Sequence, residues 1–73
     1  MKLFFVKSNK TDSFIGGYNP RRFLNLLEAR KNIRYVGKRL LPDEYARTYD
    51  IIEVDLDAIP PTVIIYDAKG FKK

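Results

Sequence analysis

The 73-residue sequence contains no cysteine and no histidine. Without cysteine the chain has no disulfide and no thiolate metal site, which suits a reducing cytosol. Without histidine it lacks the commonest general base and the commonest metal ligand, so serine–histidine and cysteine–histidine catalysis are excluded. Catalysis by carboxylates would need a pocket that so small a fold rarely encloses. We therefore expect a protein that is not an enzyme and that uses neither a metal nor a cofactor.

Long hydrophobic runs are also absent. The apolar run near the start covers only residues 3–6, which is too short for the apolar region of a signal peptide. No stretch approaches the roughly 18 apolar residues of a membrane span. A chain of this length makes one domain with a small core. The sequence thus predicts a single domain over residues 1–73, located in the cytoplasm and without a membrane partner.

Charge is distributed unevenly along the chain, although its net value is only +5. Residues 21–39 carry seven Lys and Arg against one Glu, whereas residues 40–67 carry seven Asp and Glu against one Arg. One interpretation is that the two blocks neutralise each other on one surface. The other is that the basic block contacts an acidic partner such as nucleic acid.

Hydrophobic patterning predicts four strands, at residues 2–8, 13–16, 49–56 and 62–67. Along residues 49–56 apolar and acidic residues alternate. The side chains expected to face the core are Ile52, Val54 and Leu56, and the acids between them would face solvent or a partner.

The clearest helix signal follows the glycine pair at residues 16–17. Asn19 is expected to be the N-cap and Pro20 the first helical residue, with the helix ending near Arg30. The apolar arc of this helix would consist of Phe23, Leu24, Leu26 and Leu27. Residues 33–36 are interpreted as a short extended piece and residues 42–47 as a short second helix. The order β-β-α-(α)-β-β predicts a two-layer α+β domain, with a small antiparallel or mixed sheet covered by one main helix.

The basic stretch is the candidate contact surface, because arginines form paired hydrogen bonds with phosphates and tyrosines stack on bases. Its spacing matches no helix-turn-helix, zinc finger or RNA-recognition motif, and a solvated charged face is the alternative. The candidate binding residues are Tyr18, Arg21, Arg22, Arg30, Lys31, Arg34, Tyr35, Lys38 and Arg39.

Two further patterns allow two interpretations each. Gly16 and Gly17, just before a capped helix, would either present backbone N–H groups to a phosphate or simply form a strand-to-helix turn. Glu53, Asp55 and Asp57 would either ligate a hard cation or form a solvated face.

Several short segments resemble small bacteriophage proteins. They are the strand at residues 2–8, the Gly16-Gly17-Tyr18-Asn19 turn, the Leu-x-x-Ala-Arg helix end at residues 26–30, and the Tyr-x-Ile-x-Glu-Val-Asp-Leu strand at residues 49–56. The likeness covers residues 2–56, and residues 59–67 depart from it. The resemblance implies a non-enzymatic accessory protein in the cytoplasm of a bacterial host. Such proteins act by binding a host or defence component, for example by inhibiting a nuclease or sequestering a signalling nucleotide. The alternative function is a structural or oligomerisation module, in which the basic helix of one copy meets the acidic strand of another.

Overall fold

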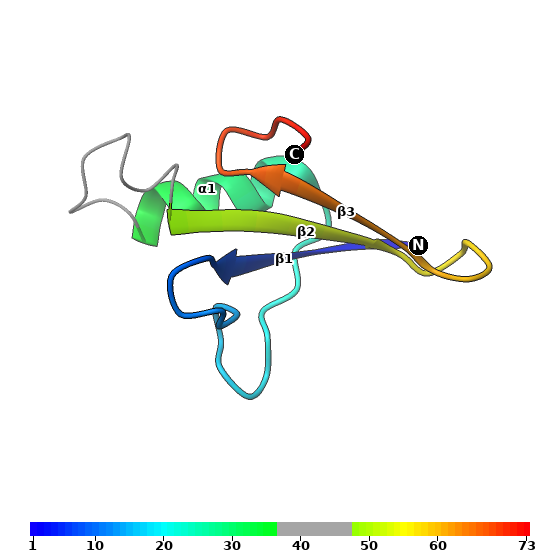
Figure 1. The fold of residues 1–73 in the computed structure, drawn as a ribbon, viewed down its shortest axis with the longest axis horizontal. Coiled ribbons are helices and arrows are strands. Elements are labelled where there is room, and N and C mark those ends of the chain that lie inside the picture. The colour runs from blue at the N-terminus through cyan, green and yellow to red at the C-terminus, as the bar shows by residue number, and fades with distance from the viewer. Residues whose placement is uncertain (37–47) are drawn as a thin grey trace.

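The computed structural model describes residues 1–36 and 48–73, which form a three-stranded antiparallel sheet with one helix packed on it (Figure 1). The elements are β1 (Lys2–Ser8), α1 (Leu26–Val36), β2 (Tyr49–Asp55) and β3 (Thr62–Asp67). The strand order is β1-β2-β3, and α1 packs on β1 and β2. The α+β class is therefore confirmed, with the order β-α-β-β in the described part. The short helix expected at residues 42–47 lies outside the described residues.

The segment between β1 and α1 follows the free edge of β1 and forms no strand of its own, so the strand expected at residues 13–16 was wrong. Phe14 and Phe23 each make a single antiparallel bridge, to Lys7 and Phe4 respectively. Phe4 and Phe23 exchange both backbone hydrogen bonds, at 2.9 and 2.8 Å. Between the two bridges Gly16 and Gly17, both at positive φ, turn the chain away from the sheet. The result is that much of the outer edge of β1 is already hydrogen-bonded.

The helix begins at Leu26, six residues later than the expected first helical residue Pro20. Its N-cap is Asn25, whose side-chain oxygen accepts a hydrogen bond from the backbone N–H of Glu28 at 2.9 Å. The bridge between Phe23 and Phe4 keeps residues 20–23 extended. A helix therefore cannot start at Pro20. The helix continues through residues 33–36, so the extended piece expected there was also wrong.

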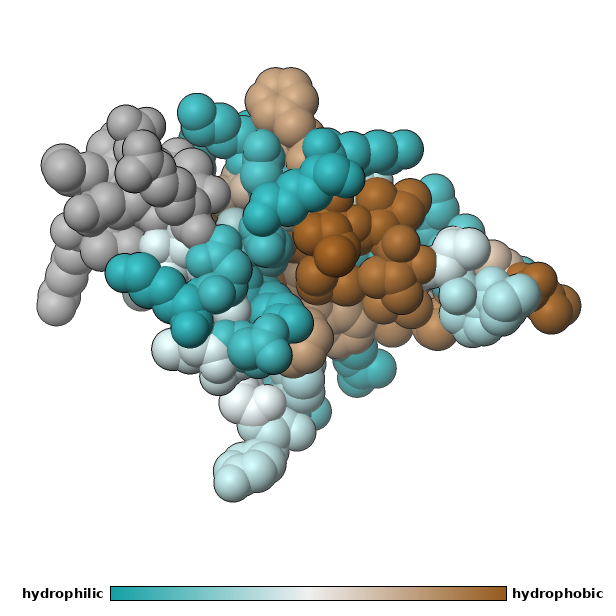
Figure 2. Space-filling model, in the orientation of Figure 1, coloured by the Kyte–Doolittle hydropathy of each residue, from teal (hydrophilic) through white to brown (hydrophobic). Residues whose placement is uncertain are grey.

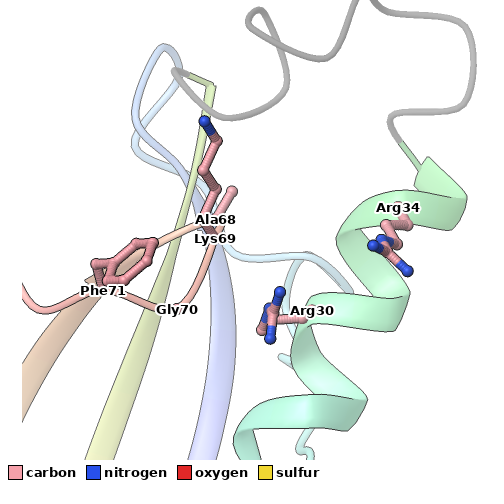
Figure 3. A pocket seen from close by; sticks show the side chains of 6 residues that line it. All are labelled: Arg30, Arg34, Ala68, Lys69, Gly70 and Phe71. Carbon is pink, nitrogen blue, oxygen red and sulfur yellow. The ribbon is translucent and has the colours of Figure 1, made fainter.

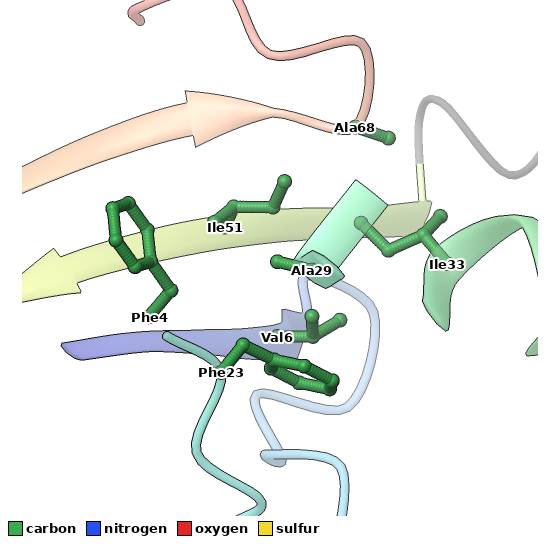
Figure 4. Packing of buried hydrophobic residues seen from close by; sticks show 7 residues of the cluster. All are labelled: Phe4, Val6, Phe23, Ala29, Ile33, Ile51 and Ala68. Carbon is green, nitrogen blue, oxygen red and sulfur yellow. The ribbon is translucent and has the colours of Figure 1, made fainter. Parts of the chain in front are cut away.

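The core lies between α1 and the face of the sheet that α1 covers (Figure 4). Ala29 and Ile33 from the helix are fully buried against Val6 and Ile51 from the two neighbouring strands. Phe4, Phe23 and Ala68 complete the buried cluster. Two members of the expected apolar arc do not take part, because Leu24 precedes the helix and is 79% exposed and Leu27 is also exposed.

Strand β2 presents its faces in the opposite sense to the expected one. Ile51 and Glu53 point toward the helix and are buried, whereas Ile52 and Val54 lie on the other face of the sheet. The register explains this orientation, because Val6 lies opposite Ile51 and Phe4 lies opposite Glu53. Glu53 is accommodated inside because its carboxylate accepts a hydrogen bond from the Tyr66 hydroxyl at 3.0 Å.

Candidate anion-binding surface

Three cationic side chains from two elements line one surface cleft (Figure 3). Arg30 and Arg34 lie one turn apart on α1, so both side chains project from the same side of the helix. Lys69 comes from the turn that follows β3. The cleft has a volume of about 500 Å³, and Ala68, Gly70 and Phe71 complete its described lining. We call this feature the cationic cleft.

The turn after β3 is held in place by Asp67. One oxygen of its carboxylate accepts the backbone N–H groups of Lys69 and Phe71, at 2.9 and 3.0 Å. Gly70 adopts a φ of +92°, and a Cβ placed there would lie 3.2 Å from Cδ of Arg30. The stem of Arg30 therefore rests against the backbone of the turn, which fixes the spacing between helix and turn.

No carboxylate is among the described residues that line the cationic cleft. The ion pairs of the described residues lie elsewhere: Lys7–Asp12, Lys31–Glu28, Lys73–Asp50, and the N-terminal amine of Met1 with Asp57. Within residues 1–36 and 48–73, the acidic strand β2 thus pairs with the C-terminal tail and not with Arg30, Arg34 or Lys69. Three positive charges that share one cleft, with no carboxylate among its described lining residues, make a favourable place for an anion.

A second group of predicted residues lies on another side of α1. Arg21, Lys31 and Tyr35 line a second concavity together with Glu28. The Lys31 ammonium pairs with Glu28 at 3.8 Å, and the Arg21 guanidinium lies over the Phe23 ring at 5.4 Å from its centroid. The Glu28 carboxylate in its lining makes this concavity less suited to an anion than the cationic cleft.

The structure therefore divides the nine predicted binding residues. Arg30 and Arg34 belong to the cationic cleft, and Arg21, Lys31 and Tyr35 belong to the second concavity. Arg22 borders the second group beside Leu24, and Tyr18 is fully exposed on the loop after the glycine pair. The two remaining candidates, Lys38 and Arg39, lie outside the described residues.

The sequence interpretation missed Lys69 and Phe71. The only signal was the three lysines of residues 68–73. This C-terminal tail returns along β3, where Lys73 donates its backbone N–H to the Ile65 carbonyl at 2.9 Å. This pairing places the tail and the preceding turn beside the sheet, with Phe71 exposed at the rim of the cleft.

The two other patterns do not form sites in this arrangement. Gly16 and Gly17 do not precede a helix start, because α1 begins at Leu26, so no helix dipole points at them. Glu53 points into the core and binds Tyr66. The described residues contain no group of three or more side chains able to hold a metal ion.

No protein-family model, no curated protein and no solved structure matches the chain. None of the helical segments in the described ranges is long and apolar enough to cross a membrane.

Proposed function

We propose that this chain is a non-catalytic binding protein whose cationic cleft takes the phosphates of a nucleic-acid strand or nucleotide. The observation that carries the proposal is that Arg30, Arg34 and Lys69 line one cleft whose described lining contains no carboxylate. Guanidinium groups match phosphate oxygens in paired hydrogen bonds, and an ammonium adds a point charge.

An exposed aromatic ring at the cleft rim supports a ligand that carries bases as well as phosphates. Phe71 is 69% exposed although it is a large apolar side chain, and it lines the same cleft as the three cations. A base stacked on an aromatic side chain gains about 1–3 kcal/mol without sequence preference.

The proposal is tested by fluorescence anisotropy with labelled single-stranded DNA and RNA over a salt series. The variant Arg30→Gln with Arg34→Gln should weaken binding by about tenfold or more and reduce the slope of log K against log salt. The matched control is Arg21→Gln with Arg22→Gln, which removes the same charge outside the cleft. Both variants are first checked by circular dichroism, because Arg30 also packs against the turn.

Equal losses in the two variants would show that only overall charge matters, and no binding at low salt would rule out the phosphate ligand. The expectation that the partner is a host or defence component stays a prediction from the resemblance to phage proteins. A pull-down from bacterial lysate with and without nuclease checks it, because an acidic protein partner survives nuclease and a bridging nucleic acid does not.

Self-association between the basic helix and the acidic strand has less support. Glu53 points into the core, and the Asp50 carboxylate pairs with Lys73 at 2.9 Å. Few free carboxylates of β2 are left for the helix of another copy.

A further inference from the structure

The face of the sheet that α1 does not cover is apolar over two of its three cross-strand rows. The register aligns Leu3, Val54 and Val63 in one row and Phe5, Ile52 and Ile65 in the next. The third row is charged and contains Lys7, Asp50 and Asp67. Figure 2 shows the apolar patch lying over the strands on the side away from the helix. We call these nine positions the open face.

This pattern differs from that of a solvent-exposed sheet face. An antiparallel sheet with one solvated face normally alternates apolar and polar residues, so the solvated face is polar. Here Val63 and Ile65 remain 59% and 42% exposed. Phe14 extends the apolar surface past the edge of β1, since its ring meets the Phe5 ring edge-on at 6.0 Å. A contiguous exposed apolar surface of this kind marks an interaction site.

We propose that a second copy of this chain packs its own open face on this one, around a two-fold axis parallel to β2. The open face has the charge pattern that such a dimer needs. Across β1, β2 and β3 the third row reads positive, negative, negative. A two-fold axis along β2 reverses the strand order of the partner, so Lys7 of each copy lies over Asp67 of the other.

The remaining positions are also compatible with this axis. Each apolar row meets the same row of the second copy, with Ile52 over Ile52 and Val54 over Val54 near the axis. The two Asp50 carboxylates approach each other, but each is already neutralised by Lys73 of its own chain. Lys7 pairs with the exposed Asp12 in the single chain, and its ammonium has further donors for a second carboxylate.

A two-fold axis perpendicular to the strands fits poorly. It would place the charged row of one copy on the apolar row that contains Leu3, which buries charges without partners. The axis along β2 also leaves α1 on the outside of each copy, in a helix–sheet–sheet–helix arrangement. The cationic cleft stays accessible there, so this proposal and the proposed function stand independently.

The size of the open face predicts a weak dimer. Three strands about 4.8 Å apart and three rows about 6.8 Å apart span roughly 14 by 20 Å, so two copies cover on the order of 600 Å² in total. That area is smaller than that of stable specific complexes, and we expect weak, reversible association with a dissociation constant of about 100 μM or weaker.

Sedimentation equilibrium from about 10 μM to 1 mM tests the association. The wild-type chain should shift from monomer toward dimer, and Ile65→Lys should weaken the dimer by about tenfold or more, because it places an unpaired charge between the sheets. The control Leu24→Lys makes the same kind of change at an exposed site off the open face. A wild-type chain that stays monomeric at 1 mM overturns the proposal, as does equal dimerisation of the two variants.

A cross-linking experiment tests the axis even if Ile65→Lys folds poorly. Because the chain has no cysteine, a single introduced one is unique. Val54→Cys lies near the axis and should be joined to its own copy by a short bis-maleimide, whereas Leu24→Cys should not. Equal cross-linking of both variants, or of neither, contradicts the arrangement.

Discussion

The hydroxyl of Tyr66 donates a hydrogen bond to the buried carboxylate of Glu53 across strands β2 and β3, at 3.0 Å. Glu53 is only 6% exposed and lies between Phe4 and Ile64 of the neighbouring strands. Burial of a carboxylate costs free energy unless it is hydrogen-bonded. The Tyr66 hydroxyl is the side-chain donor that offsets this cost, so the pair ties β3 to the core through a polar contact.

Replacing Tyr66 with Phe should lower the free energy of unfolding by about 1–3 kcal/mol, because the buried Glu53 carboxylate then lacks its hydrogen-bond donor. Urea denaturation followed by circular dichroism measures the loss. The control adds Glu53→Met to Tyr66→Phe, which removes the unsatisfied carboxylate as well. The double variant should recover stability, and a double variant less stable than Tyr66→Phe would contradict this role of the pair.

The same contact predicts a loss of stability at alkaline pH. Burial raises the pKa of Tyr66 above its ordinary value of 10.0, and the hydrogen bond to Glu53 and the negative charge of Glu53 raise it further. The folded state therefore holds this proton more tightly than the unfolded state, so its contribution to stability is complete below pH 10 and falls as the pH rises above 10. Urea denaturation from pH 8 to pH 11 should show a decline that is smaller in Tyr66→Phe. An identical decline in both proteins would exclude Tyr66 as its cause.

Glu53 also shows why alternation in the sequence predicted strand β2 but not the direction of its faces. Residues 49–56 alternate apolar and acidic side chains, so simple polarity places Ile52 and Val54 inside. Both faces of β2 contain apolar residues, because Ile51 precedes the alternating run. The choice depends on Tyr66, which is distant in sequence and makes the inward position of Glu53 acceptable.

The start of the helix depended on a long-range contact in a similar way. Asn19 with Pro20 and Asn25 with Glu28 are both good start signals at the sequence level. The backbone pairing of Phe23 with Phe4 holds the chain in an extended form up to Phe23, which leaves only the second signal usable.

Replacing each of the two asparagines with alanine in turn tests this explanation. Asn25→Ala should lower the free energy of unfolding by about 1 kcal/mol, because the N–H of Glu28 loses its side-chain acceptor. Asn19→Ala is the matched control and should change it by less than about 0.5 kcal/mol, as expected for a surface substitution away from such a contact. Thermal denaturation of the two variants measures both losses. A larger loss in Asn19→Ala would mean that the helix begins near Pro20.

The candidate surface could be predicted only in part, for a physical reason. Arg30 and Arg34 stand out in the sequence because they are close together in a basic run. Lys69 joins them only because β3 returns antiparallel to β2 and its turn comes to rest against Arg30. Charge counted along the chain does not contain that information, and it also groups Lys31 with Arg30 although the helix separates them into different concavities.

The glycine pair supplies a last prediction, because its two members differ in what surrounds them. Gly16 has a φ of +102°, and a Cβ there would lie 2.5 Å from the carbonyl oxygen of Asn19 and 2.9 Å from the backbone nitrogen of Arg21. Gly17 has a φ of +62° with nothing within 4 Å of such a Cβ. Gly17→Ala should thus cost about 1 kcal/mol for the backbone conformation alone. Gly16→Ala should cost about 3 kcal/mol or more, since backbone atoms must also move. Urea denaturation of both variants measures the difference, and equal losses would show that the turn does not hold this close backbone approach.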